Sequence, residues 1–280
     1  MNQLDLFLDG RSVRLSNALR SALLNEDAGA AAIAHRELAE FDATHHWLAP
    51  AKTLIAALRT SIPANNEEAL ADMARLEEEW IPAARAVLGE DSRDWLHRKW
   101  RDVGRALAGS PFNPKSPDRH ASYAYLRSED WLSVERCILA VPDFSAQPIL
   151  LERIAEAVWR QRRWKDAARL WFKLCWSAPD RFQGLMDHRA VPDPVLCDGW
   201  ERWQDQDLES LTSPSWFPAW MLIHEPKIAE LMPVPETTGA PQAAFAVLLK
   251  LTIGKGEEME LRRELQRLHP GLLASYLSRR

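Results

Sequence analysis

Apolar residues recur along most of this chain with the spacing of amphipathic helices. In residues 12–24, for example, Leu15, Leu19 and Leu23 repeat every four positions, which places them on one face of a helix. Good helix formers fill the chain, and runs of β-branched residues are short. The pattern therefore predicts an all-α protein with a first helix over about residues 12–24.

Pairs of helices joined by a short polar turn are predicted at three places. The second helices begin at Ala28, Trp131 and Trp164; the last two starts are 33 residues apart, and the first two are 103 apart, close to three times about 34. A small residue follows three positions later in two pairs, as Ala31 and Ala167, and a proline follows each pair. This period indicates stacked helical hairpins.

These hairpins resemble tetratricopeptide repeats, which have a period of about 34 residues. Two departures accompany the resemblance: Val134 occupies the small-residue position of one unit, and the family's full Trp-Leu-Gly-Tyr signature is missing. The resemblance covers three units and implies a tetratricopeptide-like solenoid. An atypical helical cap at the C-terminal end is expected to cover its last layer.

Two proline-rich stretches interrupt the helical pattern, and they suggest the organisation of the chain. The expected segments are an N-terminal peptide (1–10), N-terminal helical hairpins (11–109), a linker or crossing loop (110–120), a second helical-repeat segment (121–231), a proline-rich connection (232–241) and a C-terminal helical hairpin cap (242–280).

Composition and charge restrict the function classes. The 280 residues carry a formal net charge of −5, which gives no global electrostatic case for binding nucleic acid or an anionic membrane. Cys137, Cys175 and Cys197 are well separated, which fits a reducing compartment and argues against a disulfide framework. Because the first residues also lack the pattern of a signal peptide, and no apolar stretch is long enough to span a membrane, we expect a cytoplasmic protein.

Tryptophan is far above its normal usage, with 13 residues. Trp164, Ala168, Trp171 and Cys175 fall on one face of a predicted helix. We favour the interpretation that this face fills the space between stacked helices. The alternative is an aromatic-lined groove for a peptide or a nucleotide.

Basic residues cluster beside Trp164 in the sequence Arg-Gln-Arg-Arg-Trp-Lys, residues 160–165. Three aromatic residues before the second proline-rich stretch are the ones we most expect to be exposed. The predicted partner surface comprises Arg160, Arg162, Arg163, Trp164, Trp216, Phe217 and Trp220. Such groups can also bind phosphates and stack on bases, but the acidic chain makes direct contact with nucleic acid the less favoured interpretation.

No constellation of catalytic residues is apparent. The chain has no HExxH sequence, the Gly-Lys-Gly sequence at 254–256 lacks the spacing of a P-loop, and Cys197 beside Asp198 has no histidine placed to activate it. We therefore expect no catalysis, no metal and no cofactor. An enzyme with a polar cluster near Arg160, Arg163 or Asp198 is the alternative from another class.

The most specific motif is the pentapeptide Gln3-Leu4-Asp5-Leu6-Phe7. It resembles the bacterial sliding-clamp binding motif, Gln-Leu-Ser/Asp-Leu-Phe, at all five positions. The resemblance implies that the peptide lies on the clamp in an extended form. Gln3 would hydrogen-bond through its amide, Leu6 and Phe7 would fill the main apolar pocket, and Leu4 would add a secondary contact.

Two functions follow from this sequence. The first is a non-catalytic adaptor that docks on the DNA sliding clamp through residues 3–7 and presents a helical-repeat surface to a second protein. The second is a scaffold subunit of a multiprotein system, in which Leu4, Leu6, Phe7 and Leu8 pack into the protein's own core. Whether residues 1–8 are mobile or packed discriminates between them.

Overall fold

The protein was analysed as a computed structural model, which describes residues 3–206, 213–232, 235 and 238–279, and the side chains of residues 1–9 and of Leu231 lie outside the description. Every regular element in these residues is helical, and no strand occurs among them, which confirms the predicted all-α class. The chain divides into two compact units, Met1–Cys137 and Ile138–Arg280, and each is described by itself.

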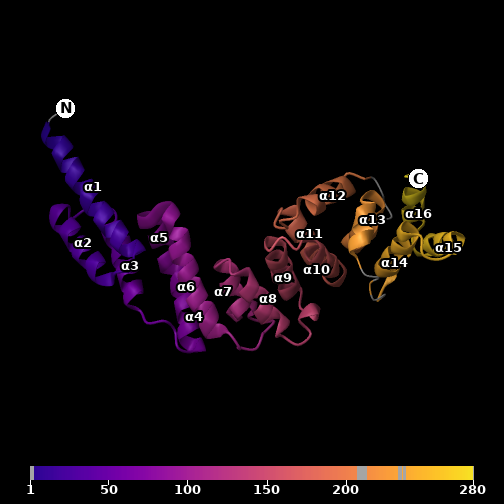
Figure 1. The fold of residues 1–280 in the computed structure, drawn as a ribbon, viewed down its shortest axis with the longest axis horizontal. Coiled ribbons are helices and arrows are strands. Elements are labelled where there is room, and N and C mark those ends of the chain that lie inside the picture. Colours follow the sequence, from indigo (N-terminus) through magenta and orange to yellow (C-terminus); the bar gives the residue numbers. More distant parts are fainter. Residues whose placement is uncertain (1–2, 207–212, 233–234, 236–237, 280) are drawn as a thin grey trace. The chain divides into compact units, whose positions relative to one another are not determined.

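Unit 1 contains the first group of helices (Figure 1). They are α1 (Gln3–Leu24), α2 (Ala28–Phe41), α3 (Leu48–Arg59), α4 (Asn66–Arg75), α5 (Ile81–Leu88), α6 (Ser92–Leu107) and α7 (Ala121–Arg127), followed by α8 (Trp131–Leu139), in which the division falls. Residues 110–120 connect α6 to α7 within unit 1, and the rings of Trp100 and Tyr123 pack edge to face across these two helices.

A π-helical turn, Leu76–Trp80, joins α4 to α5 without a break. The backbone N–H of Ile81, the residue after this turn, donates to the carbonyl of Leu76, five residues earlier. The next residue, Pro82, has no N–H to donate and cannot fit a regular turn, so the helix widens in front of it.

Unit 2 contains the remaining helices (Figure 1). They are α9 (Pro148–Arg160), α10 (Trp164–Ser177), α11 (Pro179–Asp187), α12 (Pro194–Gln204), α13 (Phe217–His224), α14 (Ala240–Ile253), α15 (Glu258–Leu268) and α16 (Pro270–Ser278), with a 3-10 helix η6 (Pro226–Leu231) after α13. Three of these helices, α14, α15 and α16, occupy the segment for which the sequence predicts a C-terminal helical hairpin cap.

The three predicted hairpin turns share one backbone geometry. The second helices begin at the predicted residues, as α2, α8 and α10, and the residue two positions before each start has a positive φ. In the first turn this residue is Glu26, whose N–H donates to Leu23; the N–H of Asp27 donates five residues back, to Ala22. The other two turns repeat these bonds, which define a Schellman motif. A fourth such turn follows α11, at Arg189.

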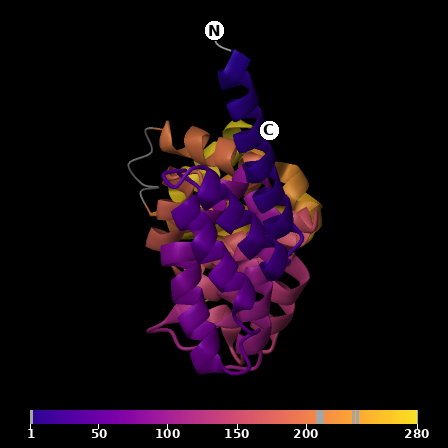
Figure 2. The ribbon, with the colours of Figure 1, turned by 90° about the vertical axis from the view of Figure 1, so that its left-hand side faces the viewer.

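The first helix begins earlier than the sequence pattern predicted. Helix α1 starts at Gln3, about nine residues before the expected start, so the prediction of a non-helical segment before residue 12 is wrong. Leu4, Phe7 and Leu8 are three and four residues apart, which is also the spacing of a helical face, and this accounts for the difference. Helix α1 has 22 residues and α2 has 14, and the first turns of α1 extend past α2 (Figures 1 and 2).

Most of the tryptophans lie in the cores of the two units. Seven of the thirteen, all of which lie in the described residues, are buried: Trp80, Trp95, Trp100, Trp171, Trp200, Trp203 and Trp220. In unit 2, Trp200 packs edge to face on Phe182 and on Phe217. Large rings fixed in this way contribute both buried area and specific geometry.

Among the residues that the structure describes, none of the helices combines the length and the apolar composition needed to cross a bilayer.

Candidate binding cavity

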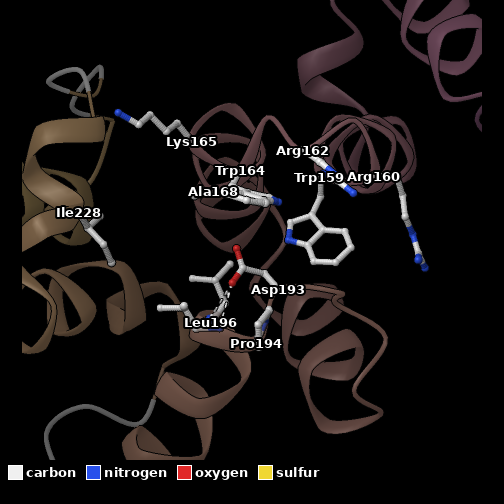
Figure 3. A pocket seen from close by; sticks show the side chains of 11 residues that line it. Trp159, Arg160, Arg162, Trp164, Lys165, Ala168, Asp193, Pro194, Leu196 and Ile228 are labelled. Carbon is white, nitrogen blue, oxygen red and sulfur yellow. Dashed lines mark hydrogen bonds between the residues drawn. The ribbon is translucent and has the colours of Figure 1, made fainter.

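A half-open cavity of about 650 Å³ lies in unit 2 where four helices and one turn meet (Figure 3). The end of α9, the following turn and the start of α10 form one side, the start of α12 forms another, and Ile228 of η6 completes it. Most of the lining is apolar, and the volume falls in the range of small-molecule and side-chain binding sites. Because several elements of unit 2 together form its lining, this cavity is the best-defined candidate site among the described residues.

Two indole rings line the cavity. Trp164, the first residue of α10, is 58% exposed and is the exposed member of the thirteen tryptophans, all of which are described. Trp159 is the last residue but one of α9, and its ring lies under the guanidinium of Arg160, with 5.6 Å from Cζ to the ring centroid. An exposed indole beside an apolar cavity is costly in water, so a partner that covers it would gain free energy.

The face of α10 that carries Trp164 changes character along its length. Trp164 and Ala168 line the cavity, whereas Trp171 and Cys175 are almost fully buried. Burial also raises the pKa of the Cys175 thiol well above its usual value, which fits a thiol enclosed in the core. The interpretation as core is therefore confirmed for Trp171 and Cys175, whereas Trp164 and Ala168 lie at the cavity.

Three basic residues, Arg160, Arg162 and Lys165, border the cavity. Arg160 is paired with Glu156 at 3.5 Å, but within the described part of the chain Arg162 and Lys165 form no ion pair. Arg162 is the residue with positive φ in the α9–α10 turn, so the turn geometry itself sets its position. The border is thus locally cationic in a chain of net negative charge.

One carboxyl group, Asp193, lies in the cavity wall and is only 8% exposed. Its Oδ1 accepts hydrogen bonds from the backbone N–H groups of Val195, at 3.0 Å, and Leu196, at 3.3 Å, which caps α12. Burial raises the pKa of Asp193, and the two N–H groups oppose that rise. In Figure 3 the carboxylate points from the start of α12 toward the side chains of Trp159 and Trp164.

The predicted partner surface is partly assembled here. Arg160, Arg162 and Trp164 line the cavity. Arg163 does not: its guanidinium contacts Asp166 in the first turn of α10, at 3.0 Å.

The prediction of exposed aromatic residues near 216–220 is wrong for two of its three members. Phe217 and Trp220 are fully buried, and Trp216 is partly buried with its ring 4.6 Å from that of His269. The reason is the composition of α13, which is apolar around its whole circumference and therefore belongs in the core.

Sequence reasoning missed Asp193, Trp159 and Ile228. For Asp193 a signal existed, because aspartate before proline is typical of a helix start, where the aspartate caps and the proline occupies the first turn. No local pattern shows that this helix start lies opposite the α9–α10 turn.

The clamp-like pentapeptide occupies the first turns of α1, as part of the helix backbone. The side chains of Gln3, Leu4, Asp5, Leu6 and Phe7 lie outside the described residues.

A second cavity, of about 470 Å³, lies between α2 and α3 of unit 1 and is bordered by His35, Lys52 and Arg59. Its lining contains no tryptophan, tyrosine or phenylalanine. No group of three or more His, Cys, Asp or Glu side chains in the described residues is placed to hold a metal ion. Of the residues named for an enzymatic alternative, Arg160 lines the unit 2 cavity and Arg163 and Asp198 do not.

No family model matches the chain, and comparisons with curated proteins and with solved structures found no significant match.

Proposed function

We propose that this chain is a protein-binding adaptor that holds a segment of a second protein by an apolar side chain in the cavity of unit 2. The observation that carries the proposal is the position of Trp164, a large apolar side chain exposed at the mouth of an apolar cavity. Rigid aromatic residues at the centre of a desolvated pocket supply much of the free energy of protein–protein binding. The repeated hairpin turns support the further proposal of a tetratricopeptide-like solenoid as the scaffold.

Selection from a peptide library tests this function without knowledge of the partner. Random dodecapeptides displayed on phage would be selected on the immobilised full chain, and each enriched peptide would be measured by fluorescence polarisation against the wild-type protein and Trp164→Ala. We expect peptides whose affinity falls at least about tenfold in the variant, since hot-spot aromatic residues contribute more than about 2 kcal/mol. Binders that are indifferent to Trp164, or no binders, would refute the cavity as the binding site.

We further propose that residues 3–7 tether this adaptor to a bacterial sliding clamp. The five-position match supports this, and so does the length of α1, whose first turns extend past α2. A second, weak contact of this kind raises the effective concentration of whatever the cavity holds. A scaffold subunit without clamp binding is the alternative, and it retains the cavity as its only proposed contact.

Calorimetry with a purified bacterial clamp tests the tether. We expect micromolar binding to the wild-type chain and none to the double variant Leu6→Ala, Phe7→Ala, with an unchanged melting temperature. Absent binding, together with a double variant that melts much earlier, would show that these side chains belong to the protein's own core.

A further inference from the structure

The geometry points to one chemical class of occupant for the unit 2 cavity: an acidic, extended peptide segment whose anchor is a tryptophan or tyrosine side chain. In this arrangement the anchor ring lies against Trp159 and Trp164, its N–H or O–H donates to Oδ2 of Asp193, and flanking carboxylates meet Arg162 and Lys165. This inference rests on the proposed function and specifies the partner of the same site.

The requirement for a donor follows from Asp193. Both backbone hydrogen bonds that cap α12 go to Oδ1, and none of the described residues donates to Oδ2 or pairs its charge with this carboxylate. Asp193 as a residue is only 8% exposed, and its Oδ2 faces the cavity (Figure 3) with no donor among the described residues, so a donor arriving with the anchor is favoured. Phenylalanine fills similar space but brings no donor, so the site discriminates against it.

The requirement for acidic flanks follows from the placement of the cations. In Figure 3 Lys165 extends to one side of the cavity, whereas Arg160 and Arg162 lie on the other. A chain that crosses the mouth with its anchor in the middle places acidic residues on both sides at once. A mononucleotide could also stack on the indoles, but it carries its charge on one phosphate group at one side. The separated cations therefore favour the peptide.

A set of pentapeptides tests the class directly. The probe is Glu-Glu-X-Glu-Glu with a fluorescent label, where X is Trp, Tyr, Phe or Ala, beside Lys-Lys-Trp-Lys-Lys, measured by fluorescence polarisation with the full chain. We expect the Trp and Tyr peptides to bind about tenfold or more tightly than the Phe peptide, as for a hydrogen bond to a charged group. The Ala and lysine-flanked peptides should bind far more weakly.

Two variants assign these preferences to residues. Asp193→Asn keeps an oxygen for the two N–H groups, since Asn caps helices as well as Asp, but it presents an NH₂ group where Oδ2 was. The preference for Trp over Phe should then disappear while Phe binding persists. Lys165→Glu should weaken the acidic peptides about fivefold at low salt, whereas Lys173→Glu, the same change at an exposed position of α10 outside the cavity, should not.

The outcomes separate this inference from the proposed function. Equal binding of Trp and Phe peptides, or a preference for the lysine-flanked peptide, would overturn the inference, while cavity-dependent peptides from the library would leave the proposed function standing. Displacement of the Trp peptide by nucleoside monophosphates at lower concentrations than by unlabelled peptide would overturn it in favour of a nucleotide site. If no peptide, including library peptides, responds to Trp164→Ala, both fail.

Discussion

The division of α10 into an exposed and a buried half can be tested by making one substitution twice. Trp164 and Trp171 lie two turns apart on the same face of the helix, and they are 58% and 1% exposed. Replacement of each by alanine removes the same atoms from the same helix. The alanine variant at Trp171 should lose stability and keep binding, whereas the alanine variant at Trp164 should lose binding and keep most of its stability.

The expected magnitudes follow from the buried areas. A tryptophan side chain carries roughly 200 Å², so complete burial of Trp171 at about 25 cal/mol per Å² gives about 5 kcal/mol, within the range of about 3–5 kcal/mol for large-to-small core changes. The indole Nε1 of Trp171 has no hydrogen-bond partner among the described residues, so the loss should fall toward the lower end. For Trp164, which is 58% exposed, the same arithmetic gives at most about 2 kcal/mol, and a compact unfolded state lowers this value further.

Urea denaturation followed by far-ultraviolet circular dichroism would measure both losses, and the library-derived peptides would report binding. Trp171→Ala should lower the free energy of unfolding by about 3–5 kcal/mol, and at temperatures where it is folded it should retain peptide binding. Trp164→Ala should lose at most about 2 kcal/mol of stability and should lose the peptides. Equal destabilisation by the two substitutions would refute the reasoning, because it would mean that Trp164 is covered by its own chain.

Two further predictions concern stability alone. A Cβ added at Gly104 would lie 2.7 Å from the Tyr125 ring, so Gly104→Ala should destabilise by about 1–3 kcal/mol in urea denaturation, whereas Gly184→Ala, which meets nothing within 4 Å, should stabilise by about 0.5–1 kcal/mol. His224 stacks on Trp220, and burial lowers its pKa to about 4. The unfolded state therefore binds more protons between about pH 6.5 and 4, so the protein loses stability as the pH is lowered through this range. Allowing for solvent screening, His224→Gln should remove about 1 kcal/mol of that loss between pH 7 and pH 5.

The hairpin turns could be predicted from the sequence because their stabilising bonds are local. In each turn the N–H groups donate to carbonyls three to five residues earlier, so the information lies within one short window. Even here the sequence carried an unusual feature, since the left-handed position that glycine usually occupies holds Glu26, Glu129 and Arg162. The polar character of these residues, and not a glycine, identified the turns.

The exposure of particular tryptophans could not be predicted in the same way. Trp164 and Trp220 both lie in helices rich in aromatic residues, yet one is exposed and the other is buried. The difference depends on what packs against each helix from distant parts of the chain, and a helix that is apolar all round, such as α13, gives no face by which to judge. The cavity has the same origin, because Asp193 and Ile228 lie about 30 and 65 residues after the α9–α10 turn in the sequence.

The pentapeptide at residues 3–7 shows how one pattern can satisfy two structures, and the competition between them gives a last prediction. In α1 these residues are helical, whereas the resemblance to clamp-binding peptides implies an extended form, so docking would require the first turns of α1 to unwind. Gly10 lies just after them, and a Cβ there meets nothing within 4 Å, so substitutions at this position act through helix propensity alone.

Gly10→Ala should favour the helix by up to about 1 kcal/mol and weaken clamp binding by up to about fivefold. Gly10→Pro should have the opposite effect, because proline is accepted in the first turn of a helix but not in its interior, so α1 would begin at residue 10 and leave residues 3–8 free. Calorimetry on both variants, with Leu6→Ala, Phe7→Ala as the baseline, measures the two shifts. If both variants bind the clamp with wild-type affinity, the segment does not leave the helix to bind, and the clamp must contact side chains presented by α1 as it stands.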